Sequence, residues 1–232
     1  MNCDRARTKC NAMISGPLDW LAIFRTVRHA KIASLFFYQL QSLGLSGGIP
    51  SAIRCRFESY YYKIAFQNIR IFDQLIKVTQ LLAEAKVGVI VLKGAALQAE
   101  VWPNLSLREM ADIDLLVRSG DLNVAERTLQ KAGYLPMEYY RPAEYYRKYH
   151  HHLVPYFNPK AAYRLPIEIH HNIKQPTVPP MLDMYDFWES SRSITFNNST
   201  LCVLSPENLL VHLCMHVAFN KLFLSHIRYL ID

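Results

Sequence analysis

Apolar residues in the first part of the chain recur every three or four positions, the spacing of one buried helix face. This spacing runs through residues 19–43 and stops at Leu43-Gly44, a typical helix end. After Pro50 a longer series follows, made of Phe57, Tyr61, Ile64, Asn68, Ile71, Leu75, Val78 and Leu82. We therefore predict that residues 1–86 form an N-terminal helical region.

The pattern changes at residue 87, where a short run of β-branched residues predicts a buried strand over 87–92. A second strand is predicted over 113–117. Helical spacing occupies 95–101 and 122–132, and the second of these helices ends at Gly133. This part of the chain thus alternates strand, helix, strand and helix.

Residues 152–157 and 165–170 are again apolar or alternating, and the turn sequence between them predicts a β-hairpin. We predict an α/β core over 87–175 and a C-terminal helical region over 176–232, with a helix that starts at Ser205-Pro206. The spacing is still helical where the sequence stops, so we expect the full-length protein to continue. The three regions can pack as one compact body.

The composition is that of a folded protein, with 51% hydrophobic residues and a net charge of +7. The five cysteines are scattered and form no CxxC pair, which predicts a reducing, cytoplasmic setting. No apolar stretch is long enough for a membrane span, and we expect no membrane partner. Basic residues are dispersed rather than clustered, so we do not expect nucleic acid as a partner either.

Two acids in the second predicted strand carry the sharpest chemical signal. Asp112 and Asp114 are two positions apart, so in a strand they share one solvent-facing side. Like charges on one face repel and need a counter-charge, which a divalent metal can supply. Spacing alone equally allows a strand end with two solvated acids beside Arg108 or Arg118.

Two further segments add to this signal. Lys93-Gly94 lies where a predicted strand meets a helix, and such a junction presents backbone N–H groups to a phosphate, although most glycines there are simple turns. Glu168 lies between apolar residues and can complete a metal site or deprotonate a hydroxyl. Its alternative is a solvent-facing acid on an amphipathic strand.

Taken together, Val91-Leu92-Lys93-Gly94, Arg108, the segment from Asp112 to Val117, and Ile167-Glu168-Ile169-His170 resemble the bacterial family of uncharacterised nucleotidyltransferases within the polymerase-β-type superfamily. This resemblance covers about residues 87–175. It implies an α+β fold, in which a nucleotidyltransferase-like mixed sheet is flanked by N-terminal and C-terminal helices.

The resemblance also implies a function and a set of site residues. An NMP group would move from an NTP to a hydroxyl of an unknown small-molecule or protein acceptor, and pyrophosphate would leave. ATP is the expected nucleotide. Asp112, Asp114 and Glu168 would hold two Mg²⁺ ions. The residues Lys93, Gly94, Ala95 and Arg108 would bind the nucleotide. The superfamily usually has Gly-Ser or Gly-Gly where this chain has Gly94-Ala95, so a catalytically inactive nucleotide-binding or scaffolding protein is the alternative.

The histidines form two groups, His150-His151-His152 and His170-His171. If the triplet lies in a strand, its side chains alternate between two faces and cannot converge on one ion. We therefore expect no metal bound by these histidines, while His152 or His170 can lie beside the acids and tune them.

Overall fold

The computed structural model describes residues 3–138, 141–161, 164–177, 179, 183–221 and 231. These residues form two compact units. Unit 1 contains 3–69, 102–109 and 231, and unit 2 contains 70–101 and the described residues from 110 to 221.

Unit 1 is helical. It contains α1 (Cys3–Ile14), α2 (Trp20–His29), α3 (Ala33–Ser42), the short 3₁₀ turn η1 (Ser46–Gly48) and the first half of α4 (Ser51–Glu84). The Asp19 carboxylate accepts a hydrogen bond from the backbone N–H of Ala22 and caps α2. Gly44 has a positive φ of 70°, which confirms the predicted helix end. The apolar spacing of 19–43 thus belongs to two helices, which are separated by Ala30, Lys31 and Ile32.

The core of unit 1 is aromatic. Phe57 of α4 stacks on Phe37 of α3 with ring centroids 5.6 Å apart, and Phe24 of α2 meets Phe57 edge-on at 4.9 Å.

Asn68 lies on the apolar side of α4 and is fully buried. Its side-chain amide donates to the carbonyl oxygens of Leu105 and Arg108, each at 2.6 Å. This polar residue therefore holds the 102–109 segment against α4.

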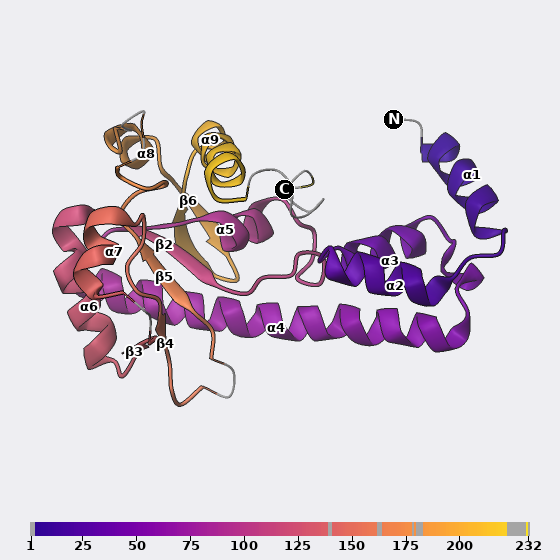
Figure 1. Cartoon of the computed structure of the whole chain (residues 1–232), viewed down its shortest axis with the longest axis horizontal. Helices are drawn as coiled ribbons and strands as arrows, with labels where there is room; N and C mark the ends of the chain where they lie inside the picture. The colour runs from indigo at the N-terminus through magenta and orange to yellow at the C-terminus, as the bar shows by residue number, and fades with distance from the viewer. Residues whose placement is uncertain are drawn as a thin grey trace. The chain divides into compact units, whose positions relative to one another are not determined.

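Unit 2 is built on a seven-stranded mixed sheet with the order β3-β4-β5-β2-β1-β7-β6 (Figure 1). The strands are β1 (Val89–Val91), β2 (Ile113–Val117), β3 (Leu135–Pro136), β4 (Tyr156–Phe157), β5 (Ile167–His170), β6 (Arg192–Phe196) and β7 (Ser199–Val203). The helices are the second half of α4, α5 (Lys93–Glu100), α6 (Leu122–Lys131), α7 (Ala143–Tyr149), α8 (Tyr185–Glu189) and α9 (Pro206–His216); the 3₁₀ turn η2 (Ser119–Asp121) and the π-helical turn η3 (Val217–Lys221) complete the unit. This architecture confirms the predicted α+β class, a mixed sheet that is preceded and followed in the sequence by helices.

Strand β2 lies inside the sheet, and all five of its residues are buried. It pairs antiparallel with β1 and parallel with β5, while β1 pairs parallel with β7. The predicted hairpin is present, because β4 and β5 pair antiparallel through Tyr156 and Ile167. The second half of α4 supports the other end of the sheet, where the rings of Phe72 and Phe196 stack 4.2 Å apart.

The expectation that the chain is helical after residue 175 is wrong for 192–203. These residues form the β6–β7 hairpin, in which Ser193 pairs with Cys202 and Thr195 with Thr200. Asn197 and Asn198 connect the strands with φ values of 47° and 61°, and asparagine adopts such values more readily than most residues. The predicted helix start at Ser205 is correct, since its hydroxyl accepts from Asn208 N–H. Residues 222–230 and 232 lie outside the described residues, and so does most of the helical continuation expected there.

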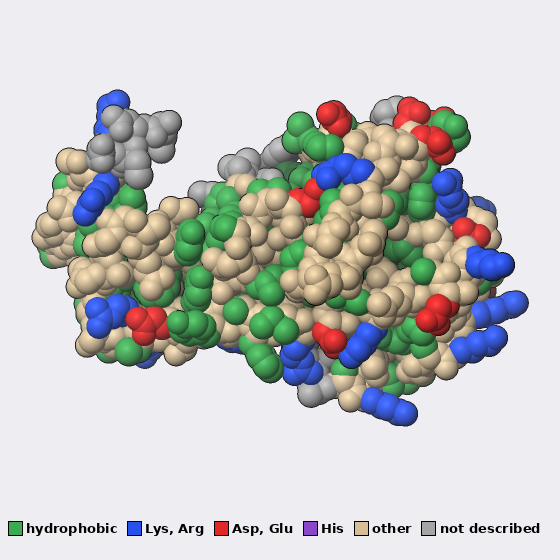
Figure 2. Space-filling view, turned by 180° about the vertical axis from the view of Figure 1, so that it is seen from behind, with side chains coloured by type: hydrophobic (Ala, Val, Ile, Leu, Met, Phe, Trp, Pro, Cys, Tyr) green, Lys and Arg blue, Asp and Glu red, His purple; other side chains and the backbone are tan. Residues whose placement is uncertain are grey.

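On the face shown in Figure 2, Lys and Arg side chains are interspersed with Asp and Glu. None of the described helices combines the length and apolarity that crossing a bilayer requires.

Candidate functional site

The parallel pairing of β2 and β5 brings two predicted site residues side by side. Asp114 and Glu168 are register partners in this pair, and so are Leu116 and His170. Because alternate residues of a strand share a face, the side chains of Asp114, Glu168 and His170 lie on one side of the sheet. One oxygen or nitrogen atom from each of these three lies within 4.8 Å of the other two.

Asp114 is buried rather than solvent-facing, with 3% of its side chain exposed. The expectation of a solvated acid is therefore wrong for this residue, because neighbouring strands and polar side chains enclose it. Lys93 Nζ lies 2.7 Å from Asp114 Oδ1 and supplies the counter-charge that the sequence argument required. Burial alone would raise the pKa of Asp114, but Lys93 and His170 hold this pKa well below its usual range.

Lys93 is positioned by the turn between β1 and α5. It is the first residue of α5 and has a φ of 45°, an uncommon value for a residue with a side chain. Burial alone would lower the pKa of Lys93, but the carboxylates of Asp114, Glu168 and Asp112 raise it. The ammonium group therefore stays charged.

His170 connects the two carboxylates. Its Nε2 lies 2.8 Å from Asp114 Oδ1 and 3.4 Å from Glu168 Oε2, and its side chain is fully buried. Glu168 keeps 20% of its side chain exposed. Burial alone would raise the pKa of Glu168, but the hydrogen bond from His170 together with the neighbouring His152 and His170 rings lowers it. Both acids of this pair are ionised at neutral pH.

Asp112 lies one residue before β2 and is half-buried. Its charge acts on Lys93, so it lies within electrostatic reach of the site. The carboxylate set brought together with His170 consists of Asp114 and Glu168, and does not include Asp112. A metal-binding role for Asp112 stays a prediction.

Gly94 and Ala95 form the first turn of α5 and are both buried. Leu92 precedes this helix and makes no side-chain capping hydrogen bond among the described residues. The first N–H groups of α5 are therefore not satisfied by a side-chain cap, as expected of a phosphate-binding helix start.

Arg108 is buried in unit 1, and its carbonyl oxygen accepts from Asn68. Lys93, Asp114 and Glu168, which contact one another or His170, belong to unit 2. A contact between Arg108 and a triphosphate stays a prediction.

Histidines surround the acids more closely than the sequence argument anticipated. His152 Nε2 lies 3.7 Å from Glu168 Oε2, and with His170 this confirms that histidines lie beside the acids. His150, His151 and His152 do not lie in a strand but in a bend after α7, apart from one bridge between His152 and His170. The strand that would make their side chains diverge is therefore absent. Burial lowers the pKa of all three, that of His152 to about 4, so the rings are neutral at pH 7.

His212 of α9 is a residue whose position the sequence did not reveal. It is fully buried, and neither ring nitrogen has a hydrogen-bond partner among the described residues. Burial and the nearby charges of Lys93 and His170 lower its pKa. The one sequence signal was its place three residues after the buried Leu209, which puts both on the same helix face.

Comparisons with known proteins add a family and a structural neighbour. The model of a protein family described as "Uncharacterised nucleotidyltransferase" matches residues 16–232. No curated protein matches the sequence. Among solved structures, the chain is similar to the lincosamide antibiotic adenylyltransferase LnuA in its lincomycin-bound form. That match has 15% identity and a TM-score of 0.44, and it covers 60% of this chain and 83% of the other.

Proposed function

Because the chain belongs to the uncharacterised nucleotidyltransferase family, we propose that it transfers an NMP group from an NTP to a hydroxyl group of a small-molecule or protein acceptor. ATP is the first candidate among the nucleotides. The observation that supports this proposal most directly is the pairing of Asp114 with Glu168 on adjacent parallel strands, beside the first turn of α5.

The carboxylate pair fits a divalent metal of the Mg²⁺ type. Mg²⁺ prefers hard oxygen ligands, and Asp114 and Glu168 each offer one within 4.8 Å of the other. We propose that these two residues hold Mg²⁺ and that Asp112 joins them. When bound, Mg²⁺ offsets the negative charge of the phosphates and of the attacking and leaving oxygens.

The side chains of the site can divide the remaining work. The N–H groups at the start of α5, which Leu92 does not cap, and the Lys93 ammonium bind phosphate oxygens. The acceptor hydroxyl oxygen forms a bond to the α-phosphorus, the bond from this phosphorus to the bridging oxygen breaks, and pyrophosphate leaves with the electron pair. Glu168 is ionised and partly exposed, so the carboxylate oxygen that does not hold Mg²⁺ takes the proton of the acceptor hydroxyl.

The Lys93–Asp114 ion pair also supports a second candidate, a nucleotide-binding protein without turnover. In the structure Lys93 occupies one oxygen of a proposed metal ligand, and Ala95 offers no hydroxyl to a phosphate. Such a protein would bind an NTP and release no pyrophosphate.

Thermal unfolding with each NTP, with and without Mg²⁺, tests the proposal. Ligand at about 100 times its Kd stabilises the folded state by about 2.7 kcal/mol. We expect NTP with Mg²⁺ to raise the unfolding temperature of the wild type and of Asp73→Asn, which alters an exposed carboxylate on α4. In Asp114→Asn this rise should be lost.

A pyrophosphate-release assay on the same proteins separates the two candidates. Release that needs Mg²⁺, Asp114 and an acceptor supports the transferase. Binding without release under any acceptor supplied favours the second candidate, and no response to any NTP contradicts both.

A further inference from the structure

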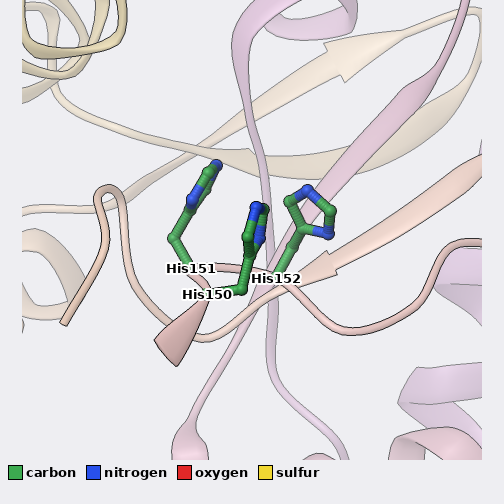
Figure 3. Close-up of side chains that lie close together, drawn as sticks. All are labelled: His150, His151 and His152. Atoms are coloured by element: carbon green, nitrogen blue, oxygen red, sulfur yellow. The ribbon is translucent and has the colours of Figure 1, made fainter. Parts of the chain in front are cut away.

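Three consecutive imidazole rings lie close together beside the carboxylate pair. His150, His151 and His152 follow α7, and their rings lie side by side and point in the same direction (Figure 3). The ring centroid of His150 lies 4.5 Å from that of His151 and 4.1 Å from that of His152. Each residue offers one ring nitrogen within 4.8 Å of the other two.

The hydrogen bonding of His152 shows which of its nitrogens carries a lone pair. Its Nδ1 lies 2.6 Å from the carbonyl oxygen of Leu153, which can only accept, so Nδ1 carries the proton. In the neutral ring Nε2 is then an acceptor, and it faces Glu168 Oε2 at 3.7 Å. Two acceptors that face each other repel, and a cation between them turns this repulsion into attraction.

The rings of His150 and His151 each contain a nitrogen that takes no part in the hydrogen bonding of the described residues. The Nδ1 atoms of His150 and His151 are buried and have no hydrogen-bond partner among the described residues. Buried polar atoms are nearly always satisfied, so each such atom requires an explanation. A bound metal ion explains both at once.

We propose that His150, His151 and His152 bind one divalent transition-metal ion of the Zn²⁺ class, with Glu168 as the adjacent carboxylate. Imidazole suits zinc, copper, nickel and cobalt, whereas Mg²⁺ prefers oxygen. Zn²⁺ takes histidine nitrogens at about 2.0–2.1 Å in tetrahedral sites, so small ring rotations would bring the three nitrogens into range. The bond from His152 Nδ1 to a backbone carbonyl is typical of a metal-binding histidine, because it fixes the ring and its tautomer.

This site differs in chemistry from the proposed Mg²⁺ site and requires neither an NTP nor an acceptor. The two sites meet at Glu168, which lies 3.7 Å from His152 and in register with Asp114. Zinc on the histidines would place a second positive charge beside the carboxylate that we assign to the acceptor hydroxyl. The inference goes beyond the proposed function and can hold if that function fails.

The test measures Zn²⁺ affinity and stoichiometry with untagged protein, by competition with a chromogenic chelator in excess Mg²⁺. We expect one Zn²⁺ per chain, and an affinity at least about tenfold lower in His150→Gln and in His151→Gln. His29→Gln, which alters an exposed histidine on α2, should bind zinc like the wild type. Co²⁺ in place of Zn²⁺ should give visible absorption bands in the wild type that weaken in the two site variants.

The proposal is overturned if the wild type binds no stoichiometric zinc, or if His150→Gln and His151→Gln bind it as tightly as the wild type. His151 is 6% exposed, whereas His150 is half-buried. If His151→Gln fails to fold, His150→Gln therefore decides the outcome. Asp114→Asn separates the two proposals, because it should lose the Mg²⁺-dependent response to NTP and keep zinc binding.

Discussion

Lys93 Nζ and Asp114 Oδ1 lie 2.7 Å apart and join the first residue of α5 to the second residue of β2. Both side chains are largely withdrawn from water, with 13% and 3% exposed. A charge in such a place is tolerated only with a partner, so each of the two residues depends on the other.

A double-mutant cycle should reveal this dependence. Lys93→Met and Asp114→Asn should each lower the free energy of unfolding by about 3–5 kcal/mol, because each removes the closest opposite charge from the other buried group. The double variant should lose clearly less than the sum of the two, as measured by urea unfolding. Additive losses would contradict a coupled pair.

The exposed pair of Lys77 and Asp73 on α4 is the control for this cycle. Its side chains are 63% and 62% exposed, with Nζ and Oδ2 2.8 Å apart. Water screens such pairs, so Lys77→Met should change stability by about 0–1 kcal/mol.

The same carboxylate predicts a pH dependence. The pKa of Asp114 is lower in the folded than in the unfolded protein, so the unfolded state binds more protons in acid. The stability that Asp114 contributes is present above the usual Asp pKa of about 3.9 and is lost as the pH falls toward the folded value. Urea unfolding of wild type and Asp114→Asn should therefore show a difference that shrinks below about pH 4. A constant difference down to pH 2 would contradict this assignment.

Asn68 should be essential to unit 1 although it stands in an apolar series. Asn68→Leu removes both hydrogen bonds to the 102–109 segment and leaves two carbonyl oxygens without their donor. We expect a loss of about 2–3 kcal/mol in the free energy of unfolding. Asn123→Leu on the exposed side of α6 should stay within about 0.5 kcal/mol of the wild type. A small effect at residue 68 would indicate that water replaces the amide.

The turn of the β6–β7 hairpin can be tested through its positive φ values. Asn198 has a φ of 61°, which glycine adopts without strain and valine does not. Asn198→Gly should be neutral or slightly stabilising, whereas Asn198→Val should cost about 1–2 kcal/mol in thermal unfolding. Equal effects of the two changes would exclude this turn geometry.

The sequence was most informative where a local pattern decides the structure. The strand at Ile113–Val117 is a continuous apolar run around one acid, and the helix at Pro206 starts with a capping serine. Both were predicted because neighbouring residues alone determine them. The β6–β7 hairpin was not predicted, since its strands are short, β6 has no buried residue, and β7 finds its partner β1 far away in the sequence.

The candidate site was predictable as a set of residues but not as a set of contacts. Lys93, Asp114 and Glu168 were selected together, and the parallel register of β2 and β5 places the two acids side by side. That Lys93 pairs with Asp114 depends on how α5 leaves the sheet, which no spacing rule describes. The shared direction of the histidine triplet does not follow from strand alternation, because the chain bends at these residues and a bend lets consecutive side chains share a direction.

The place of β1 in the sheet has a consequence for how the protein is made. β1 is bordered by β2 on one side and by β7 on the other, and β7 is synthesised long after β1. While a nascent chain lacks β7, β1 offers an open strand edge with apolar side chains, a surface on which incomplete chains pair with one another. Chains that end before Ser199 would therefore be prone to aggregation. The β6–β7 hairpin is the segment that covers the open edge of β1 and prevents this pairing.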